Sequence, residues 1–212
     1  MSHRGDGLQL YSVRVTNFLA QVGIGDRIHA IRKQHGIRSA KALAELIPGD
    51  NVTESILQNI EAGRKDDLLV SQLLNIAKAL RVTPIFLLAP ISTPSARLDI
   101  ANLSSSFDDM TVVQFDAWIS GEPDGAYDWN NLAERSERTQ LHAMRELHEQ
   151  IRERRRLAAK LDAAIDTGRG DHAGDTTKGR LKDADRRIAQ LTSYLASAGW
   201  DLAGWDLAGW AD

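Results

Sequence analysis

Four polar side chains on one short predicted helix are the residues of this sequence best suited to contact another molecule. The stretch NVTESILQNIEAGRK, residues 51–65, places Ile56, Leu57 and Ile60 at helical spacing. The rest of that helix surface carries Glu54, Ser55, Gln58 and Asn59. Carboxylate, hydroxyl and amide groups donate and accept hydrogen bonds. The pattern predicts either a solvated outer face or a surface that presents these groups to a partner.

Capped helices surround that stretch. Ser39 and Thr53 stand where N-caps are expected, as the first residue of SAKALAELI and directly before residues 54–62. Gly36 closes GDRIHAIRKQHG as a C-terminal glycine. A fourth helix is predicted to begin behind Ser71 and a fifth behind Thr83, with a proline at its first position. Five short helices therefore occupy about 65 residues, and strand signals are scarce along the whole chain.

Composition places the chain among ordinary globular proteins. It has 212 residues, 42% hydrophobic and 26% charged, and no cysteine, which excludes disulfides and thiolate zinc sites. No apolar run approaches the length of a membrane span and no signal-peptide pattern is present, so we expect a cytoplasmic protein without a membrane partner. Residues 1–97 hold 12 Lys and Arg against 8 Asp and Glu, whereas residues 98–212 hold 14 against 21. This asymmetry indicates different roles for the two halves.

The second half is predicted to be long-helical. We expect an N-terminal arm or short helix over 1–23, a linker over 91–109, a helical interaction region over 110–198 and a Trp-repeat tail over 199–212. Apolar positions recur at 3-4 spacing in two stretches, interrupted only by Arg154. They are joined by TGRGDHAGDTTKG, which predicts an antiparallel hairpin or coiled-coil strands that pair between subunits. The first stretch looks about twice as long as the second. That difference leaves a stripe around Leu132 and 141–147 for a second copy of the chain to cover.

The order of the N-terminal helices carries further information. A capped helix, a turn and a second capped helix whose first residues are polar and unemployed form a helix-turn-helix pattern. In such a unit the second helix enters the major groove of DNA and its first turns face base edges.

At this point the sequence resembles the Cro/CI-type, or xenobiotic-response-element, helix-turn-helix family. The resemblance covers residues 24–90 and rests on IGDRIHAIRKQHGI, ALAEL, VTESILQNIEAGRK and LLNIAKALRVTPIFLL. It implies an all-α fold with an N-terminal five-helix, lambda-repressor-like domain, here followed by the long-helix hairpin or coiled coil. It also implies that the helix over 53–62 reads DNA.

The resemblance assigns roles position by position. The residues that match base-reading positions are Glu54, Ser55, Gln58 and Asn59; amides pair with adenine and carboxylates with cytosine. The residues that match phosphate-contacting positions are Ser39, Lys41, Thr53, Arg64 and Lys65. Arg32 and Glu61 match a salt-bridged pair between two helices. The chain departs from the family in a turn about three residues longer, over 48–52, and in Ala40, which replaces a polar residue. Alternatively, Glu54 is only an acidic residue that complements the helix dipole, and Arg64 and Lys65 are only solvated residues at a helix end.

Enzymatic chemistry has little support. His142 and Glu146 lie at i, i+4 and His148 lies off that face, so we interpret them as solvated positions of a charged helix rather than a metal site. The Gly- and Asp-rich segment over 168–179 lacks the spacing of a phosphate-binding loop. We therefore expect no catalytic residue, no metal and no cofactor.

These features together predict a sequence-specific DNA-binding transcriptional regulator, a repressor of bacterial or phage type. Its expected partners are double-stranded DNA and a second copy of the chain bound through the C-terminal helices. Two alternatives stay open. One is an antitoxin that binds a toxin through those helices and represses its own operon through the N-terminal domain. The other is a nucleoid-bridging protein with little sequence preference. The Trp tail is either the product of a duplicated coding segment, with its Trp side chains packed on nearby surface, or a segment that binds a partner.

Overall fold

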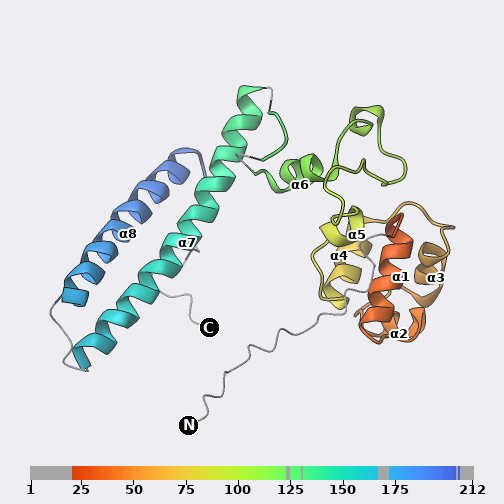
Figure 1. Ribbon diagram of the computed structural model, residues 1–212, viewed down its shortest axis with the longest axis horizontal. Helices are drawn as coiled ribbons and strands as arrows, with labels where there is room; N and C mark the ends of the chain where they lie inside the picture. Colours follow the sequence, from red (N-terminus) through yellow and green to blue (C-terminus); the bar gives the residue numbers. More distant parts are fainter. Residues whose placement is uncertain (1–20, 123–124, 130, 167–171, 204, 206–212) are drawn as a thin grey trace, which may run out of the picture. The chain divides into compact units, whose positions relative to one another are not determined.

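The computed structural model describes residues 21–122, 125–129, 131–166, 172–203 and 205. Within these ranges the structure is helical or irregular and holds no strand beyond one isolated bridge between Arg97 and Thr111. The all-α prediction is confirmed. The chain divides into two compact units between Asp116 and Ala117 (Figure 1). Neither the N-terminal 20 residues of the arm predicted over 1–23 nor the last repeat with Trp210 belongs to the described residues.

Five short helices build the first unit. They are α1 (Ile24–Gln34), α2 (Ala40–Glu45), α3 (Glu54–Glu61), α4 (Val70–Ala79) and α5 (Ile85–Leu88). Each contributes apolar side chains to one core, whose fully buried members include Ile28, Ile31, Leu43, Leu57, Ile76, Leu80 and Leu87. Burying one such side chain contributes about 1.5–3 kcal/mol. Helices this short are unstable alone, so the shared core holds them in place.

The predicted ends of these helices are largely confirmed. The Ser39 hydroxyl accepts from the Ala42 amide at 3.1 Å, and the Thr53 hydroxyl accepts from the Ile56 amide at 3.3 Å. Gly36 follows α1 with φ +73°, in the left-handed region that favours glycine.

The predicted start of α4 is wrong by two residues. The helix begins at Val70, and the Gln72 side chain accepts from the Leu69 amide at 3.3 Å. Ser71 lies inside the first turn, where its hydroxyl accepts from Asn51 instead. Likewise α5 begins at Ile85, and Pro84 precedes it with helical backbone angles.

The segment over 91–109 is not an extended linker. Its apolar residues pack with α5 and the start of α6 (Val112–Ser120) in a second cluster, made of Ala89, Val112 and Phe115 with Ile85, Leu88, Ile91, Ala96, Leu98, Ile100 and Met110 around them. A single 3₁₀ turn, η2 (Ser105–Phe107), interrupts the segment. The compact unit consequently extends to Asp116 rather than ending near residue 90.

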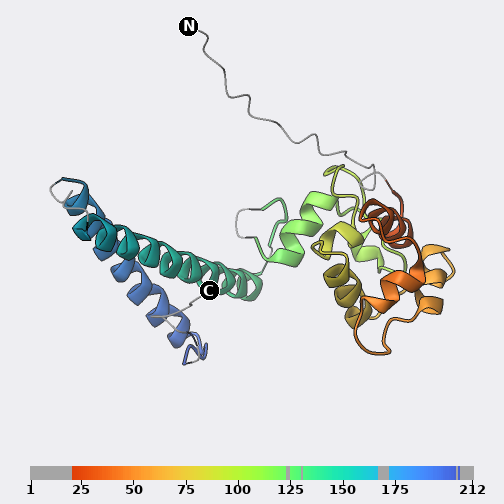
Figure 2. The ribbon, with the colours of Figure 1, turned by 90° about the horizontal axis from the view of Figure 1, so that it is seen from below.

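Two long helices dominate the second unit. α7 (Leu132–Asp166) and α8 (His172–Ser197) pack side by side and run in opposite directions (Figure 2). The face between them buries Ala143, Leu147, Ile151, Leu157, Ala184, Ile188, Leu191 and Leu195. At one end, Arg145 donates to the carbonyls of Ser120 and Gly121, which close the C-terminus of α6.

The prediction that the first of these helices is about twice as long as the second is wrong. Residues 172–179, expected in the hairpin tip, are the first two turns of α8, which gives 26 residues against 35 in α7. Leu147 is fully buried and Ala143 nearly so, hence the stripe expected to need a second copy is covered within the chain. Only Leu132, 82% exposed, stands at an uncovered end.

The beginning of the Trp repeat completes that cover. Trp200, Leu202 and Trp205 pack against the cluster around Leu147, and the Trp200 indole donates to the Gln140 carbonyl oxygen at 2.8 Å. These residues favour the packed-duplication interpretation of the tail over an exposed binding segment.

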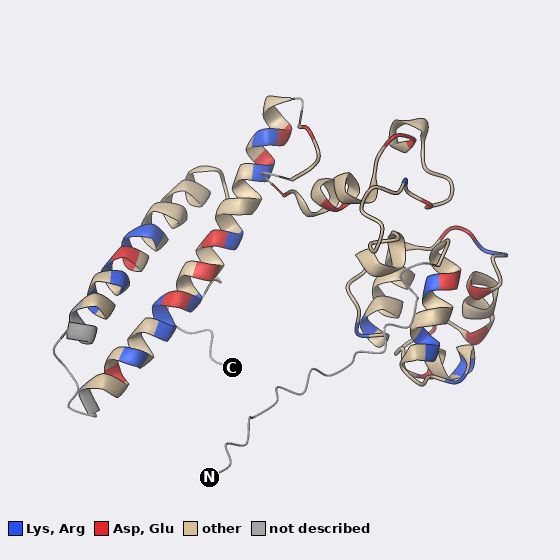
Figure 3. Ribbon diagram, viewed as in Figure 1, with Lys and Arg blue, Asp and Glu red and all other residues tan. Residues whose placement is uncertain are grey.

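Ion pairs line the edges of the helix pair. Arg187 meets Glu146 at 2.6 Å, Arg180 meets Glu153 at 2.6 Å, and Arg154 meets Asp185 at 2.7 Å. The first two pairs lie seven residues apart on each helix, in opposite directions, as an antiparallel register requires. Figure 3 shows acidic and basic positions interspersed along both helices. Arg154, the polar member of the predicted stripe, is thus accommodated by a carboxylate on the facing helix.

Candidate nucleic-acid interface

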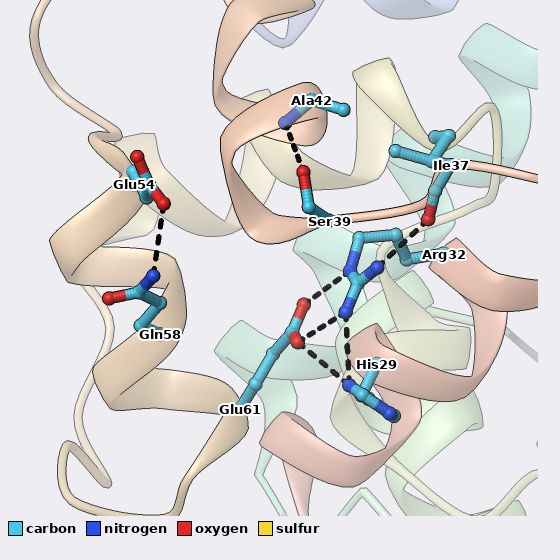
Figure 4. A network of polar contacts seen from close by, with 8 residues as sticks. All are labelled: His29, Arg32, Ile37, Ser39, Ala42, Glu54, Gln58 and Glu61. Carbon is cyan, nitrogen blue, oxygen red and sulfur yellow. Dashed lines mark hydrogen bonds and ion pairs between the residues drawn. The ribbon is translucent and has the colours of Figure 1, made fainter.

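The outer face of α3 carries the four residues singled out in the sequence. Leu57 and Ile60 are buried on the opposite side of this eight-residue helix. Glu54, Ser55 and Gln58 are exposed over its first turns, and the Gln58 amide donates to the Glu54 carboxylate at 3.0 Å (Figure 4). That contact is an exposed one and is readily exchanged for another acceptor.

Asn59 differs from the other three. It is half-buried, and its side-chain oxygen accepts from the Arg64 guanidinium at 2.9 Å. The backbone amides of Arg64 and Lys65 donate to its carbonyl, so Asn59 also organises the end of α3. Gly63 permits this tight end with φ +63°. Asn59 and Arg64 are therefore hydrogen-bonded to each other. A base that binds Asn59, or a phosphate that binds Arg64, must replace this hydrogen bond.

The predicted phosphate-contacting residues lie in three different settings. Ser39 and Thr53 use their hydroxyls as helix caps, at the N-termini of α2 and α3 respectively. Lys41 is exposed on the first turn of α2. Lys65 is half-buried, and its ammonium donates to the Gln72 side-chain oxygen at 2.9 Å. Lys65 is thus tied to α4, which the sequence did not indicate.

The lengthened turn before α3 is held by α4. The Gln72 side chain, 4% exposed, donates to the Asn51 carbonyl at 3.0 Å, and the Asn51 amide donates to Ser71 at 2.9 Å. Val52 in the same turn is buried in the core. These contacts fix the start of α3 although the turn is long. Sequence inspection missed Gln72, whose place on the apolar face of α4 was the available signal.

Arg32 of α1 and Glu61 of α3 form the expected pair. The guanidinium donates to both carboxylate oxygens at 2.7 Å and to the Ile37 carbonyl at 2.8 Å (Figure 4). The His29 ring nitrogen Nδ1 lies 2.7 Å from the same carboxylate. Burial raises the pKa of the Glu61 carboxyl, but hydrogen bonds from Arg32 and His29 outweigh it, so the pKa lies below its ordinary value.

A second buried pair joins α1 to the segment after α5. The Arg27 guanidinium, 1% exposed, donates to both oxygens of Asp99 at 2.7 and 2.9 Å. It also donates to the carbonyls of Leu87 and Leu88 at the end of α5. Burial raises the pKa of the Asp99 carboxyl, yet hydrogen bonds from Arg27 and the Gly23 amide hold that pKa below its ordinary value. A basic residue beside Ile28 and Ile31 on an apolar helix face was the signal for such a partner.

Close contact between α1 and α3 sets their separation. A Cβ atom placed on Gly25 would lie 2.1 Å from the Ile60 carbonyl oxygen, far inside van der Waals contact. Glycine at this position therefore allows the backbones to approach. Together with the Arg32–Glu61 pair, this contact seats α3 on α1.

The histidines and carboxylates of α7 do not gather into a metal site within the described ranges. No group of three metal-ligating side chains gathers there, and Glu146 is engaged by Arg187 rather than by His142. No helix in these ranges has the length and apolarity to cross a bilayer. Comparison with protein-family models, with curated proteins and with solved structures finds no significant match to this chain.

Proposed function

We propose that this protein is a sequence-specific DNA-binding transcriptional regulator whose first unit is a Cro/CI-type helix-turn-helix domain. In this proposal α2, the turn and α3 form the helix-turn-helix, and α3 lies in the major groove. Glu54, Ser55 and Gln58 read base edges directly, and Asn59 does so after releasing Arg64.

The exposed polar face of α3 carries the proposal. Its side chains stand on a helix whose opposite face is fully buried, so their backbone positions are fixed before any ligand arrives. Such preorganisation lowers the entropy lost on binding. Gln and Asn amides match the N6 and N7 edge of adenine, and a carboxylate accepts from cytosine N4.

Backbone contacts would orient the domain. The N-terminus of α2 offers amide groups near Ser39 with Lys41 beside them, and Thr53 caps α3 at the groove edge. Amide groups at helix N-termini favour phosphate oxygens. Lys65 has a smaller role than its sequence position suggested, because Gln72 holds its ammonium.

We also propose that the protein acts as a homodimer. Two-fold symmetric dimers suit helix-turn-helix proteins because two half-sites about one helical turn apart multiply a modest affinity. The support for this proposal is that functional requirement, since the apolar stripe of α7 is already covered by α8 and Trp200. Sedimentation of the full chain at tens of micromolar tests it, and a monomer there excludes the dimer.

Selection from a random duplex library tests sequence reading. We expect enrichment of a defined sequence, and Gln58→Ala should weaken binding to it by about 1–3 kcal/mol while leaving binding to random DNA nearly unchanged. Gln34→Ala, which truncates an exposed glutamine at the end of α1, is the matched control and should change neither. No enriched sequence, or equal losses on both DNAs, would contradict base reading by α3.

A further inference from the structure

We propose that the middle of the α7–α8 pair is a second nucleic-acid surface, which contacts DNA backbone phosphates through Arg152, Arg156 and Arg180. Residues 149–160 and 178–187 together hold ten Lys and Arg against four Asp and Glu, a balance of +6. The rest of the chain holds 16 against 25, a balance of −9. A concentration of positive charge within an otherwise acidic chain attracts a polyanion to one place.

The three arginines come together from both helices. Arg152 and Arg156 lie one turn apart on α7, and Arg180 joins them from α8. All three border one surface hollow of about 420 Å³, together with Glu149, Gln150 and Glu153. The side chains of Arg156 and Arg180 are 60% and 61% exposed. Figure 3 shows basic positions on both helices of this pair.

The existing ion pairs do not neutralise the positive charge of these arginines. Arg156 and Arg180 both donate to the single carboxylate of Glu153, at 2.9 and 2.6 Å. Two guanidiniums on one carboxylate leave a net positive charge. Arg152 adds a third guanidinium and Glu149 a second carboxylate, so the hollow has a balance of +1. Exposed pairs of this kind contribute at most about 1 kcal/mol, so a phosphate can displace them. A guanidinium also matches phosphate with two parallel hydrogen bonds.

These arginines lie outside the buried face of the helix pair, although Arg180 forms one exposed pair between the helices. The buried face is formed by Leu147, Ile151, Leu191 and other apolar residues, whereas the arginines are exposed to solvent. Arginines placed outside the core, and more numerous than the local carboxylates, are better explained by an external anion than by stability. The choice of DNA as that anion rests on the proposed function; an acidic protein is the competing ligand.

The test uses the full chain carrying Arg152→Gln, Arg156→Gln and Arg180→Gln together, with a random duplex of about 40 base pairs as probe. The dependence of log Kobs on log salt should flatten by about 2–3, because each lost phosphate contact contributes about 0.9. Near 0.1 M salt we expect binding to fall at least tenfold. Thermal unfolding followed by Trp fluorescence should stay a single transition with only a small shift, because Arg180→Gln removes one exposed pair between the helices. That result would show that the helix pair is intact.

A variant on the same hollow should act in the opposite direction. Glu149→Gln removes a carboxylate beside the arginines and should raise duplex affinity and steepen the salt dependence. An unchanged slope in the triple variant, or tighter binding of poly-glutamate than of duplex at equal charge, overturns the inference.

The two proposals fail in different ways. If Gln58→Ala abolishes sequence preference while the triple variant keeps the parental slope, only the second surface is lost. If no sequence is enriched but the triple variant still flattens the slope, the second surface stands and base reading by α3 falls.

Discussion

In the first unit the guanidiniums of Arg27 and Arg32 are buried and join α1 to segments distant in sequence, whereas the arginines that pair across α7 and α8 stay exposed on the edges. The core of short helices is small, so polar links complete the attachment of α1 to its neighbours. The long helices bury a continuous apolar face and need ion pairs only to favour one register. Charge placement therefore follows helix length: short helices use buried pairs to fix positions, and long helices use exposed pairs to select among alignments.

Breaking a buried pair should have the largest effect. Arg27→Met leaves Asp99 partly buried without its cation and frees two α5 carbonyls, which should cost about 3–5 kcal/mol. Arg97→Met is the control, because Arg97 and Asp109 are 71% and 91% exposed, and it should have almost no effect.

The positions of the tryptophans allow the two units to be followed separately. All five lie after Asp116, at positions 118, 129, 200, 205 and 210. Denaturation of the Arg27→Met chain should therefore split the far-UV circular dichroism transition. The part from the first unit moves to lower denaturant, while the part from α7 and α8 stays with the Trp fluorescence transition. A common shift of both signals would show that the units do not unfold independently and would end the comparison.

Gly25→Ala should have the next largest effect. The new methyl group would displace the Ile60 carbonyl, and such overpacking typically costs about 1–3 kcal/mol. Because α3 must move away from α1, preference for the selected DNA sequence should fall as well. Gly179→Ala, on an exposed position of α8 with no atom near the added Cβ, should instead be neutral or stabilising. Unchanged stability in Gly25→Ala would show that the helices relax freely.

Acid should destabilise the first unit more than the second. The pKa values of Asp99 and Glu61 are lowered in the folded state, so the unfolded chain binds more protons as the pH falls. The stability from these pairs is complete above the ordinary values near 3.8 and 4.5, and it is lost as the pH falls through the lowered values. Melting curves from pH 7 to about pH 3 should show an early circular dichroism component, from the first unit, whose midpoint falls before the Trp fluorescence midpoint. The reverse order would contradict the assignment of the buried pairs.

The exposed edge pairs should matter least. Arg187→Ala removes the partner of Glu146, whose pKa is lowered chiefly by that hydrogen bond. The Arg187 and Glu146 side chains are 46% and 23% exposed, so solvent screening limits the loss to about 0.2–1 kcal/mol. The fluorescence midpoint in urea should report it, and added salt should reduce the difference between variant and parent. A loss above about 2 kcal/mol would mean that this pair does more than select register.

Local chemistry made much of the first unit predictable. Ser39, Thr53 and Gly36 act over three or four residues, and their roles are visible in any window of that length. The pair between Arg32 and Glu61 was reached only through resemblance to a family, because 29 residues separate its members.

Long-range contacts explain what the sequence did not reveal. Asp99 lies among prolines and irregularly spaced apolar residues, which is typical of a linker, yet it binds Arg27 across 72 residues. The contacts of Gln72 with Asn51 and Lys65 likewise depend on a fold that already exists.

The start of α8 was missed for a related reason. Gly174, Asp175 and Gly179 have low helix propensity, so the sequence around them is typical of a loop. In the structure all three lie within α8, which packs along α7. Tertiary packing therefore overrides a local preference that a sequence window records correctly.

The Trp repeat after α8 has a genetic consequence. Trp200, Leu202 and Trp205 pack on the helix pair, and the unit AGWDL that supplies them recurs directly in the chain. Loss of any one five-residue unit by replication slippage brings an identical Trp, Leu and Trp back to positions 200, 202 and 205. Gain of a unit or loss of one is therefore silent for this hydrophobic contact, whereas loss of both units would remove Leu202 and Trp205. Selection on the packed residues consequently sets a lower limit on the number of repeats and no upper limit.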